Sequence, residues 1–200
     1  SFPKNVVRFF VEEESPYGKK YPRVVKYAPE RDIAVAISEY APGRFVTIDK
    51  KIYKSGGIYA SPKPHGYDTN QAEFYFGNKD YFNDILVCSE CNWFGHKEDG
   101  LDTCPYCHAP VEIRKMLKPW GFAPERGDAV KFEDEDEDKT YAEAPYYSHV
   151  PEESQMIPYK GQIRFANLEN RQVLTVNMGK SKHGFNICRC CGGAEVADPK

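Results

Sequence analysis

"CSECNWFGHKEDGLDTCPYC" (88–107) contains two Cys-x-x-Cys pairs with twelve residues between them. Tetrahedral zinc needs four ligands at about 2.3 Å from one point, and a two-residue spacer lets a tight turn aim both sulfurs of a pair inward. The pairs Cys88/Cys91 and Cys104/Cys107 meet this requirement. The stretch therefore predicts a structural zinc site, in which four thiolates leave no position for a reactive water.

Two other roles for these thiols have less support. A redox Cys-x-x-Cys needs one pair beside a βαβ pattern, which this sequence lacks. Disulfides are typical of secreted proteins, and "SFPKNVVRFFVEEESP" (1–16) has no long apolar segment followed by a small-residue cleavage site. His96 and His108 are close enough in sequence to act as ligands. With four cysteines present, we expect both at the surface or next to the ligands.

The terminal "CRCC" (188–191) predicts half of a second zinc site. Cys188 and Cys191 have knuckle spacing and are followed by glycines that suit the turn, whereas Cys190 breaks the simple pattern. Two ligands make a weak site. Three alternatives stay open: the completing ligands lie beyond this chain, His183 and another residue contribute, or these are ordinary thiols on a strand.

Composition narrows the class of protein. Two hundred residues, 40% hydrophobic with a net charge of −3, suffice for one sizeable domain or two small ones. No apolar run approaches the roughly 18–20 residues that cross a bilayer, so we expect no membrane association. Seven cysteines without a signal peptide predict a cytoplasmic protein with reduced thiols. A first residue other than Met and an end just after a cysteine cluster predict a piece of a longer chain.

Hydrophobic patterning predicts an α+β, β-rich fold of short strands and hairpins, a zinc-ribbon-like four-cysteine module and few short helices. "PERDIAVAISEYAPG" (29–43) has apolar residues at helical spacing and predicts a helix with Pro29 in its first turn. "RFVTIDKKIYKSGGIYA" (44–60) predicts a hairpin that turns at Asp49-Lys50. Further strands are predicted in these segments: "AEFYFG" (72–77), "DILVC" (84–88) and "GFNIC" (184–188).

The sequence suggests three consecutive regions that together form one compact unit. Residues 1–87 are an N-terminal segment with the helix and the hairpin, and residues 88–118 are the zinc-ribbon-like four-cysteine module. Residues 119–200 begin with an acidic loop and continue as a β segment that ends in the second cysteine cluster. Within this region, "KFEDEDEDKTYAEAP" (131–145) predicts an exposed, disordered loop, because it has little apolar content and a block of like charge.

Charge is unevenly distributed along the chain. Residues 132–153 contain nine acidic residues against Lys139, and residues 157–191 contain six basic residues against Glu169. The basic residues predict weak contact with DNA phosphates. The alternative is a solvated face that the acidic stretch partly neutralises. The six are Lys160, Arg164, Arg171, Lys180, Lys182 and Arg189.

Catalytic signatures are missing from the sequence. It contains no G-x-x-x-x-G-K-[ST], G-x-G-x-x-G, G-x-S-x-G or H-E-x-x-H motif. The five histidines are scattered, and the adjacent carboxylates lie within a charge run. We expect that this chain is not an enzyme and has no catalytic residue.

Four passages, in this order, resemble one family: "AISEYAPGRFVTIDKKIYKSGGI" (36–58), "CSECNWFG" with "CPYC" (88–107), "KPWGFAPE" (118–125) and "LTVNMGKSKHGFNICRCCG" (174–192). The chain resembles the zinc-binding C-terminal region of MrfA-type DEAD/DEAH-box helicases, a region also found in the DISARM components DrmA and DrmB. The passages cover most of residues 30–193. Members of that family follow the last knuckle with further Cys or His ligands, which would make Cys188 and Cys191 half of a site.

The resemblance implies a parent protein that translocates on DNA in repair or phage defence, with helicase motor domains in cis or in trans. This chain would be a non-catalytic zinc-stapled accessory domain that supports nucleic-acid binding or motor assembly, with Trp93, Phe94 and Trp120 as stacking surfaces. Aromatic residues at these spacings more often pack in a core. The alternative is a protein-docking module that couples a helicase to a nuclease or methyltransferase without contacting DNA. A third hypothesis is an enzyme whose site the sequence does not reveal.

Overall fold

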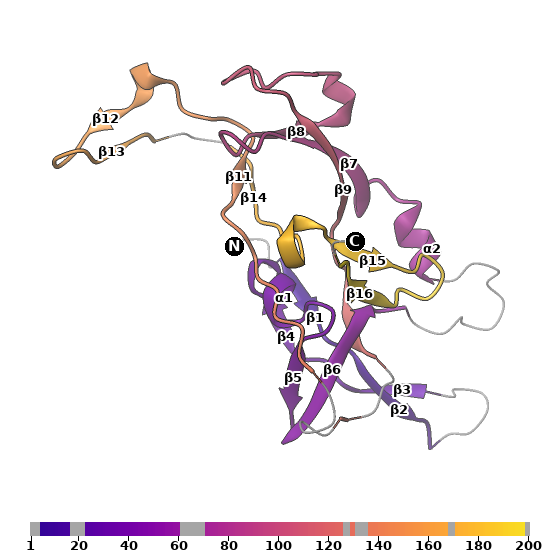
Figure 1. Ribbon diagram of the computed structural model, residues 1–200. Coiled ribbons are helices and arrows are strands. Elements are labelled where there is room, and N and C mark those ends of the chain that lie inside the picture. Colours follow the sequence, from indigo (N-terminus) through magenta and orange to yellow (C-terminus); the bar gives the residue numbers. More distant parts are fainter. Residues whose placement is uncertain are drawn as a thin grey trace. The chain divides into compact units, whose positions relative to one another are not determined.

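The computed structural model describes residues 5–16, 23–60, 71–125, 129–130, 136–167 and 171–198. The chain forms two compact units, each assembled from separated stretches (Figure 1). Unit 1 contains the described residues of Ser1–Phe82, Leu117–Glu143 and Val176–Lys200, and unit 2 those of Asn83–Met116 and Ala144–Thr175. Short paired strands dominate, so the predicted β-rich α+β class is confirmed. The division into consecutive regions 1–87, 88–118 and 119–200 stays a prediction.

Unit 1 consists of antiparallel pairs and one three-stranded sheet. The sheet has the order β10-β6-β5, and the pairs are β1-β4, β2-β3 and β15-β16. Its elements are β1 (Val6–Arg8), β2 (Val11–Glu14), β3 (Arg23–Tyr27), β4 (Glu30–Asp32), α1 (Ile33–Glu39), β5 (Phe45–Ile48), β6 (Lys51–Ile58), α2 (Gln71–Phe76), β10 (Phe122–Pro124), the 3-10 turn η4 (Lys180–Lys182), β15 (Phe185–Ile187) and β16 (Ala194–Val196).

The predicted hairpin at 44–60 is confirmed, with β5 antiparallel to β6. Its two turn residues, Asp49 and Lys50, both have positive φ, at 48° and 61°. This is the conformation of a two-residue type I′ turn, whose twist matches that of the strands it joins. Val46 lies opposite Tyr53, and both side chains are buried, which fixes the register by placing one face of the hairpin on the core.

Helix α1 is shorter than the predicted 29–43 and begins later. Asp32 is its N-cap, because its carboxylate accepts a hydrogen bond of 2.9 Å from the Ala34 N–H. Pro29 is therefore outside the first turn, and the preceding residues Glu30–Asp32 pair as β4 with β1. Long-range pairing with residues 6–8 explains why the helix starts where it does.

The core of unit 1 combines residues that are far apart in the sequence. Helix α1 contributes Ala36 and the flanking Tyr40, whose ring lies 5.3 Å from that of Phe9, measured between centroids. Phe122 of β10 adds a third ring, with its centroid 6.0 Å from that of Tyr40. The buried members of this cluster are Val7, Phe9, Val11, Ala36, Tyr40, Val46, Tyr53, Ile58 and Phe122.

The strand predicted at 72–77 is wrong, because this segment forms helix α2. Aromatic residues favour strands by propensity, but helical spacing here places Ala72 and Phe76 together in buried positions. Tyr75 of the same helix stacks on Trp120, with ring centroids 4.0 Å apart. Burial against an aromatic cluster from elsewhere in the chain therefore outweighs local propensity.

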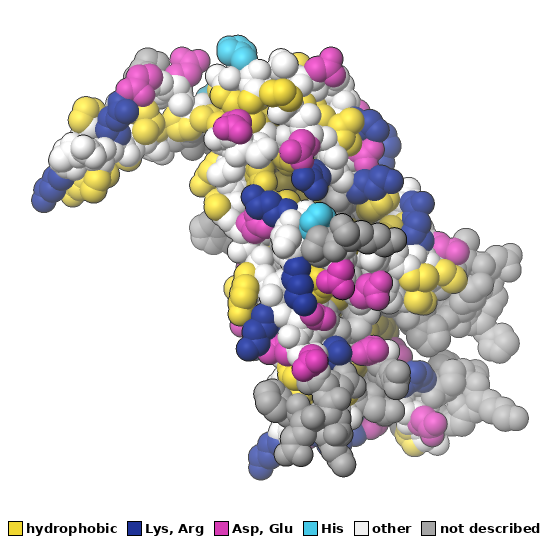
Figure 2. All heavy atoms as spheres, in the orientation of Figure 1, with side chains coloured by type: hydrophobic (Ala, Val, Ile, Leu, Met, Phe, Trp, Pro, Cys, Tyr) yellow, Lys and Arg dark blue, Asp and Glu magenta, His cyan; other side chains and the backbone are white. Residues whose placement is uncertain are grey.

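Residues 131–135 of the predicted acidic loop lie outside the described residues, whereas 136–145 are ordered by contacts. Thr140 is buried, and its hydroxyl accepts a hydrogen bond from the Asn177 side chain. Asp138 pairs with Lys180 at 2.5 Å, and Glu143 with Lys182 at 3.6 Å. Two of the six basic residues, Lys180 and Lys182, are thus neutralised by the acidic stretch, as in the alternative to DNA contact. On the face drawn in Figure 2, acidic and basic side chains are interspersed.

The hairpin β15-β16 contacts strand β6 through backbone hydrogen bonding at glycines. The Ile58 N–H donates to the Gly192 carbonyl at 2.8 Å, and Gly57 forms an isolated bridge with Gly193. A Cβ on Gly192 would lie 2.3 Å from the Ile58 carbonyl oxygen, and φ at Gly192 is +78°. Both the space and the backbone conformation therefore require glycine at this position.

Unit 2 contains a three-stranded sheet, in the order β8-β7-β9, and two separate strand pairs, β11-β14 and β12-β13. The strand predicted at 84–88 is confirmed as β7. No helix in the described parts of the chain is long and apolar enough to cross a membrane. The elements are β7 (Phe82–Val87), β8 (Phe94–His96), the 3-10 turn η2 (Lys97–Asp99), β9 (Glu112–Leu117), β11 (Tyr146–Tyr147), the 3-10 turn η3 (Glu153–Gln155), β12 (Ile157–Pro158), β13 (Arg164–Phe165) and β14 (Val173–Leu174).

We predict that Gly192→Ala destabilises the protein by more than the about 1–2 kcal/mol that a left-handed alanine costs by itself. The added methyl group would also push the β15-β16 hairpin away from β6. Gly100→Ala is the matched control, because φ is +64° there and no atom lies within 4 Å of the added Cβ. Urea unfolding of both variants measures the difference. Equal losses of stability would show that the close contact with Ile58 is unimportant.

Candidate metal centre

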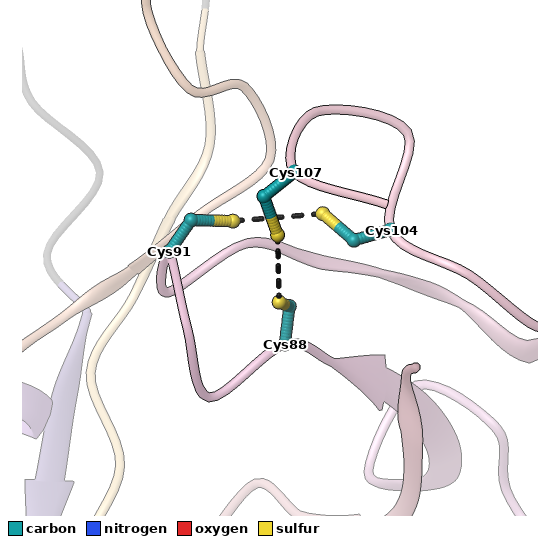
Figure 3. Close-up of side chains that lie close together, drawn as sticks. All are labelled: Cys88, Cys91, Cys104 and Cys107. Carbon is teal, nitrogen blue, oxygen red and sulfur yellow. Dashed lines mark hydrogen bonds between the residues drawn. The ribbon is translucent and has the colours of Figure 1, made fainter. Parts of the chain in front are cut away.

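The four predicted ligands converge on one point in unit 2 (Figure 3). Their sulfur atoms all lie within 4.8 Å of one another. The Sγ atoms of Cys88 and Cys107 are 3.5 Å apart, as are those of Cys91 and Cys104. Sulfurs at about 2.3 Å from a central zinc would be about 3.8 Å apart in a regular tetrahedron. The cluster can therefore hold a metal ion, and its spacing and donor type suit structural zinc.

Strand β7 delivers the first knuckle. It ends at Val87, and the Cys88 N–H then donates to the Trp93 carbonyl at 2.8 Å, which closes the loop that carries Cys91. Asn92 has a positive φ of 56°, and this reverses the chain into β8. Asn tolerates this conformation better than most residues.

The second knuckle has the same backbone design. The Cys104 N–H donates to the Ala109 carbonyl at 2.8 Å, and the His108 N–H donates to the Cys104 carbonyl at 3.0 Å. His108 takes the left-handed conformation, with φ at 60°. It is exposed and is outside the cysteine cluster, so its position is that of a turn residue and not of a ligand.

The cluster lies within the small core of unit 2. Cys88 and Cys104 are fully buried and pack with Leu86 and Trp93. Burial raises the pKa of the Cys91 thiol, and the hydrogen bond with the Cys104 thiol acts in the same direction. Four thiolates in this environment need a compensating cation, which a divalent metal ion supplies.

A segment that the sequence did not connect with the cysteines packs beside the two knuckles. Tyr106, between two ligands, is hydrogen-bonded through its hydroxyl to His149 Nδ1. The Tyr147 N–H donates to the Asn92 carbonyl at 2.8 Å. Neither contact has a local sequence signal, because the partners are far apart in the chain and no motif links them.

The terminal knuckle lies in unit 1 and repeats backbone features of the two knuckles of unit 2. The Cys188 N–H donates to the Gly193 carbonyl at 2.8 Å, and the Gly192 N–H donates to the Cys188 carbonyl at 2.8 Å. The residue after the second cysteine is again left-handed, here Gly192. The predicted strand 184–188 is confirmed as β15, which delivers Cys188 just as β7 delivers Cys88.

The three terminal cysteines are all exposed. N–H groups of Cys191 and Cys190 point at the Cys188 sulfur and lower its pKa. Within the described ranges, the tetracysteine cluster is the one group of three or more Cys, His, Asp or Glu side chains with metal-binding geometry. Cys188 and Cys191 therefore have the backbone conformation of a zinc knuckle. Among the described residues, neither His183 nor another side chain joins them in a group of three possible ligands.

The six basic residues are divided between the two units. Lys160, Arg164 and Arg171 belong to unit 2, and the other three belong to unit 1. Lys180 and Lys182 are paired with acidic side chains, as described above. Arg189 lies over the rings of Phe76 and Phe82, at 5.5 and 5.4 Å from their centroids.

The stacking surfaces suggested at Trp93 and Phe94 are wrong, since only 4% and 6% of these residues are exposed. Trp120 is partly buried, and its Nε1–H donates to the Tyr59 carbonyl at 2.6 Å. Its ring is already stacked on Tyr75. The alternative that these aromatic residues belong to cores accounts for all three.

Fold and site together define a strand-rich chain with a tetracysteine cluster that could hold a metal ion. No family model matches it, and no solved structure matches it. Over 208 aligned positions the chain is 30% identical to Druantia protein DruE of Escherichia coli (strain UMEA 4076-1). The similarity covers 99% of this chain and 11% of that protein, so the chain spans about a ninth of its relative. The resemblance to MrfA-type helicases and DISARM components stays a prediction.

We predict that Cys104→Ser releases the metal and lowers the melting temperature, because Cys104 is both a ligand and part of the buried core. Cys190→Ser is the control, since Cys190 is exposed and outside the cluster. Elemental analysis and thermal unfolding measure the two effects. Full metal content with unchanged melting in Cys104→Ser would contradict the assignment.

Proposed function

We propose that this chain is a non-catalytic, zinc-stapled accessory region of a large anti-phage defence protein, and that it supports nucleic-acid binding or motor assembly. Two observations support the proposal. Nearly the whole chain is similar to a segment of a Druantia protein, and four cysteines converge on a metal-sized centre. The remaining roles, including ATP-driven translocation on DNA and any part in DNA repair, belong to other parts of the protein or to partners.

The tetracysteine centre is the observation that carries the proposal. Five of the seven strands of unit 2 have only two or three residues, and isolated pairs of such strands are marginally stable alone. Structural zinc contributes on the order of 10 kcal/mol to the folding of a small module. A closed sulfur tetrahedron has no open coordination position, so its role is to hold the fold.

A non-enzymatic role also agrees with the ion pairs that the acidic residues at 137–143 form. Glu137 lies 3.4 Å from the Arg44 side chain, and Asp138 and Glu143 pair with lysines. Carboxylates that are engaged in ion pairs are poorly placed to act as general acids or bases. We therefore propose that this chain contributes no catalytic group to the parent protein.

The terminal knuckle is proposed as half of a second zinc site, because its hydrogen bonds and left-handed residue match those of the tetracysteine knuckles. Its two thiols are exposed on a hairpin that is fastened to β6. The other two ligands would come from residues outside the described chain, in cis or from a partner. Zinc bound there would link the terminal knuckle to the segment or partner that supplies the other two ligands. It would not be a site made only of this chain's described residues.

Zinc stoichiometry separates the two sites. We predict about one tightly bound zinc per chain, which Cys104→Ser removes and Cys188→Ser leaves in place. A second zinc that disappears in Cys188→Ser would show that the terminal knuckle finds its remaining ligands within this chain. Loss of all zinc in Cys188→Ser, or no zinc in the unmodified protein, would contradict the tetracysteine assignment.

The alternative function is a protein-docking module that couples a motor to a nuclease or methyltransferase, without DNA contact. The neutralisation of Lys180 and Lys182 by Asp138 and Glu143 favours it, because these cations are less available to phosphates. The chain's net charge of −3 acts in the same direction.

Salt-dependent binding distinguishes the two functions. We predict that the zinc-loaded chain binds a DNA oligonucleotide at about 50 mM salt and loses most of this affinity by about 200 mM, since phosphate contacts release counterions. Fluorescence anisotropy with single-stranded and duplex probes measures it. Absence of binding to either probe at low salt would favour the docking module.

A further inference from the structure

The hairpin β12-β13 of unit 2 has an entirely apolar face. Ile157 lies opposite Phe165 in the strand register, and the Tyr159 N–H donates to the Ile163 carbonyl at 2.9 Å. Residues two apart on a strand and residues directly opposite each other point to the same face. The side chains of Ile157, Tyr159, Ile163 and Phe165 therefore share one face.

This face is uncovered in the described chain. The four residues are exposed by 50%, 64%, 61% and 47% in the same order. The hairpin pairs with no other described strand, and it forms the end of the orange segment in Figure 1. An isolated two-stranded hairpin is marginally stable in water, and adjacent exposed apolar residues mark an interaction site.

Cations accompany the rings on this hairpin. Residues 157–165 contain Lys160 and Arg164 and no acidic residue. The Lys160 ammonium lies 5.8 Å from the centroid of the Tyr159 ring. Arg164 is paired with Glu153. On the face drawn in Figure 2, basic and hydrophobic side chains lie side by side on the segment that contains this hairpin.

Tyr159 and Phe165 form an edge-to-face pair. Their ring centroids are 6.3 Å apart, and the ring planes are inclined by 77°. Such a pair covers at most one face of one ring, and the two residues stay 64% and 47% exposed. The exposed surface of each ring can accept a flat aromatic partner.

We propose that this hairpin is a contact site for single-stranded nucleic acid. Bases would stack on Tyr159 and Phe165, because every base offers a π-face and such stacking needs no particular sequence. Ile157 and Ile163 would cover the edges of the stacked bases. Lys160, whose ammonium lies near the Tyr159 ring, would bind a phosphate. Arg164 precedes Phe165 on the strand and therefore points to the opposite face, where it is paired with Glu153. The inference rests on the proposed nucleic-acid role of the chain and identifies the surface that performs it.

Charge favours nucleic acid over a protein partner for this face. The centres of protein interfaces are depleted in lysine, whereas single-strand binding grooves combine aromatic rings with cations. The paired lysines of unit 1 offer no comparable combination. Their contacts are to the carboxylates of Asp138 and Glu143. The exposed ring in the same acidic segment, Tyr141, already has the Arg44 guanidinium 5.3 Å from its centroid.

The test uses the full zinc-loaded chain and a fluorescent oligo(dT) probe of about 20 nucleotides at low salt. Tyr159→Ala and Phe165→Ala are each expected to weaken binding about 10-fold. Tyr159→Phe should retain the affinity, since it keeps the ring. Lys160→Ala should lower the slope of log K against log salt by about 1. Phe74→Ala is the matched control, because Phe74 is 62% exposed on α2 of unit 1.

Three outcomes are distinguishable. If the chain binds oligo(dT) and only the hairpin variants lose affinity, with zinc content and melting unchanged, the proposal holds. If it binds and the hairpin variants match Phe74→Ala, the hairpin proposal is overturned while the nucleic-acid role stands. If the unmodified chain binds no probe at low salt, both fail, and the apolar face belongs to a protein partner.

Discussion

The convergence of four cysteine sulfurs is the constraint on which unit 2 depends. Their mutual distances of at most 4.8 Å place them close to the corners of a zinc-sized tetrahedron. Two of the four are fully buried, and burial opposes the ionisation that metal binding requires. A divalent cation held there would resolve this conflict, because it would stabilise the thiolates and join the two knuckles at the same time. It would also support the small core around Trp93, into which Cys88 and Cys104 pack.

The same backbone conformation positions the cysteines of all three knuckles. Each knuckle has a hydrogen bond from the first cysteine N–H to the carbonyl five residues on, at 2.8 Å. Each also has a left-handed residue directly after the second cysteine, which is Asn92, His108 or Gly192. The first two knuckles face each other within unit 2. The third is fastened to β6 in unit 1 by contacts that only glycine permits, so its exposed thiols are held on a rigid base.

The two units differ in the partners of their charged side chains. In unit 1, the carboxylates of Glu137, Asp138 and Glu143 engage an arginine and two lysines, and this segment is ordered by the buried Thr140. In unit 2, the hairpin β12-β13 combines exposed rings with Lys160, and its Arg164 is paired with Glu153. The ion pairs of unit 1 would suit a structural role, and the exposed rings of the hairpin β12-β13 would suit contact with a partner.

Local spacing in the sequence was enough to identify the knuckles and the β5-β6 hairpin, because a two-residue spacer and an Asp-Lys turn act over a few residues. Spacing also identified β7 and β15, which end directly at cysteines. It failed for residues 72–77, where strand-forming aromatics became helix α2 because Ala72 and Phe76 are buried together. The resemblance, and not spacing, suggested Trp93 and Phe94 as stacking surfaces, and both are buried within unit 2. Tertiary structure alone decided which cations are paired and which apolar face stays open, because these depend on contacts between residues that are distant in the chain.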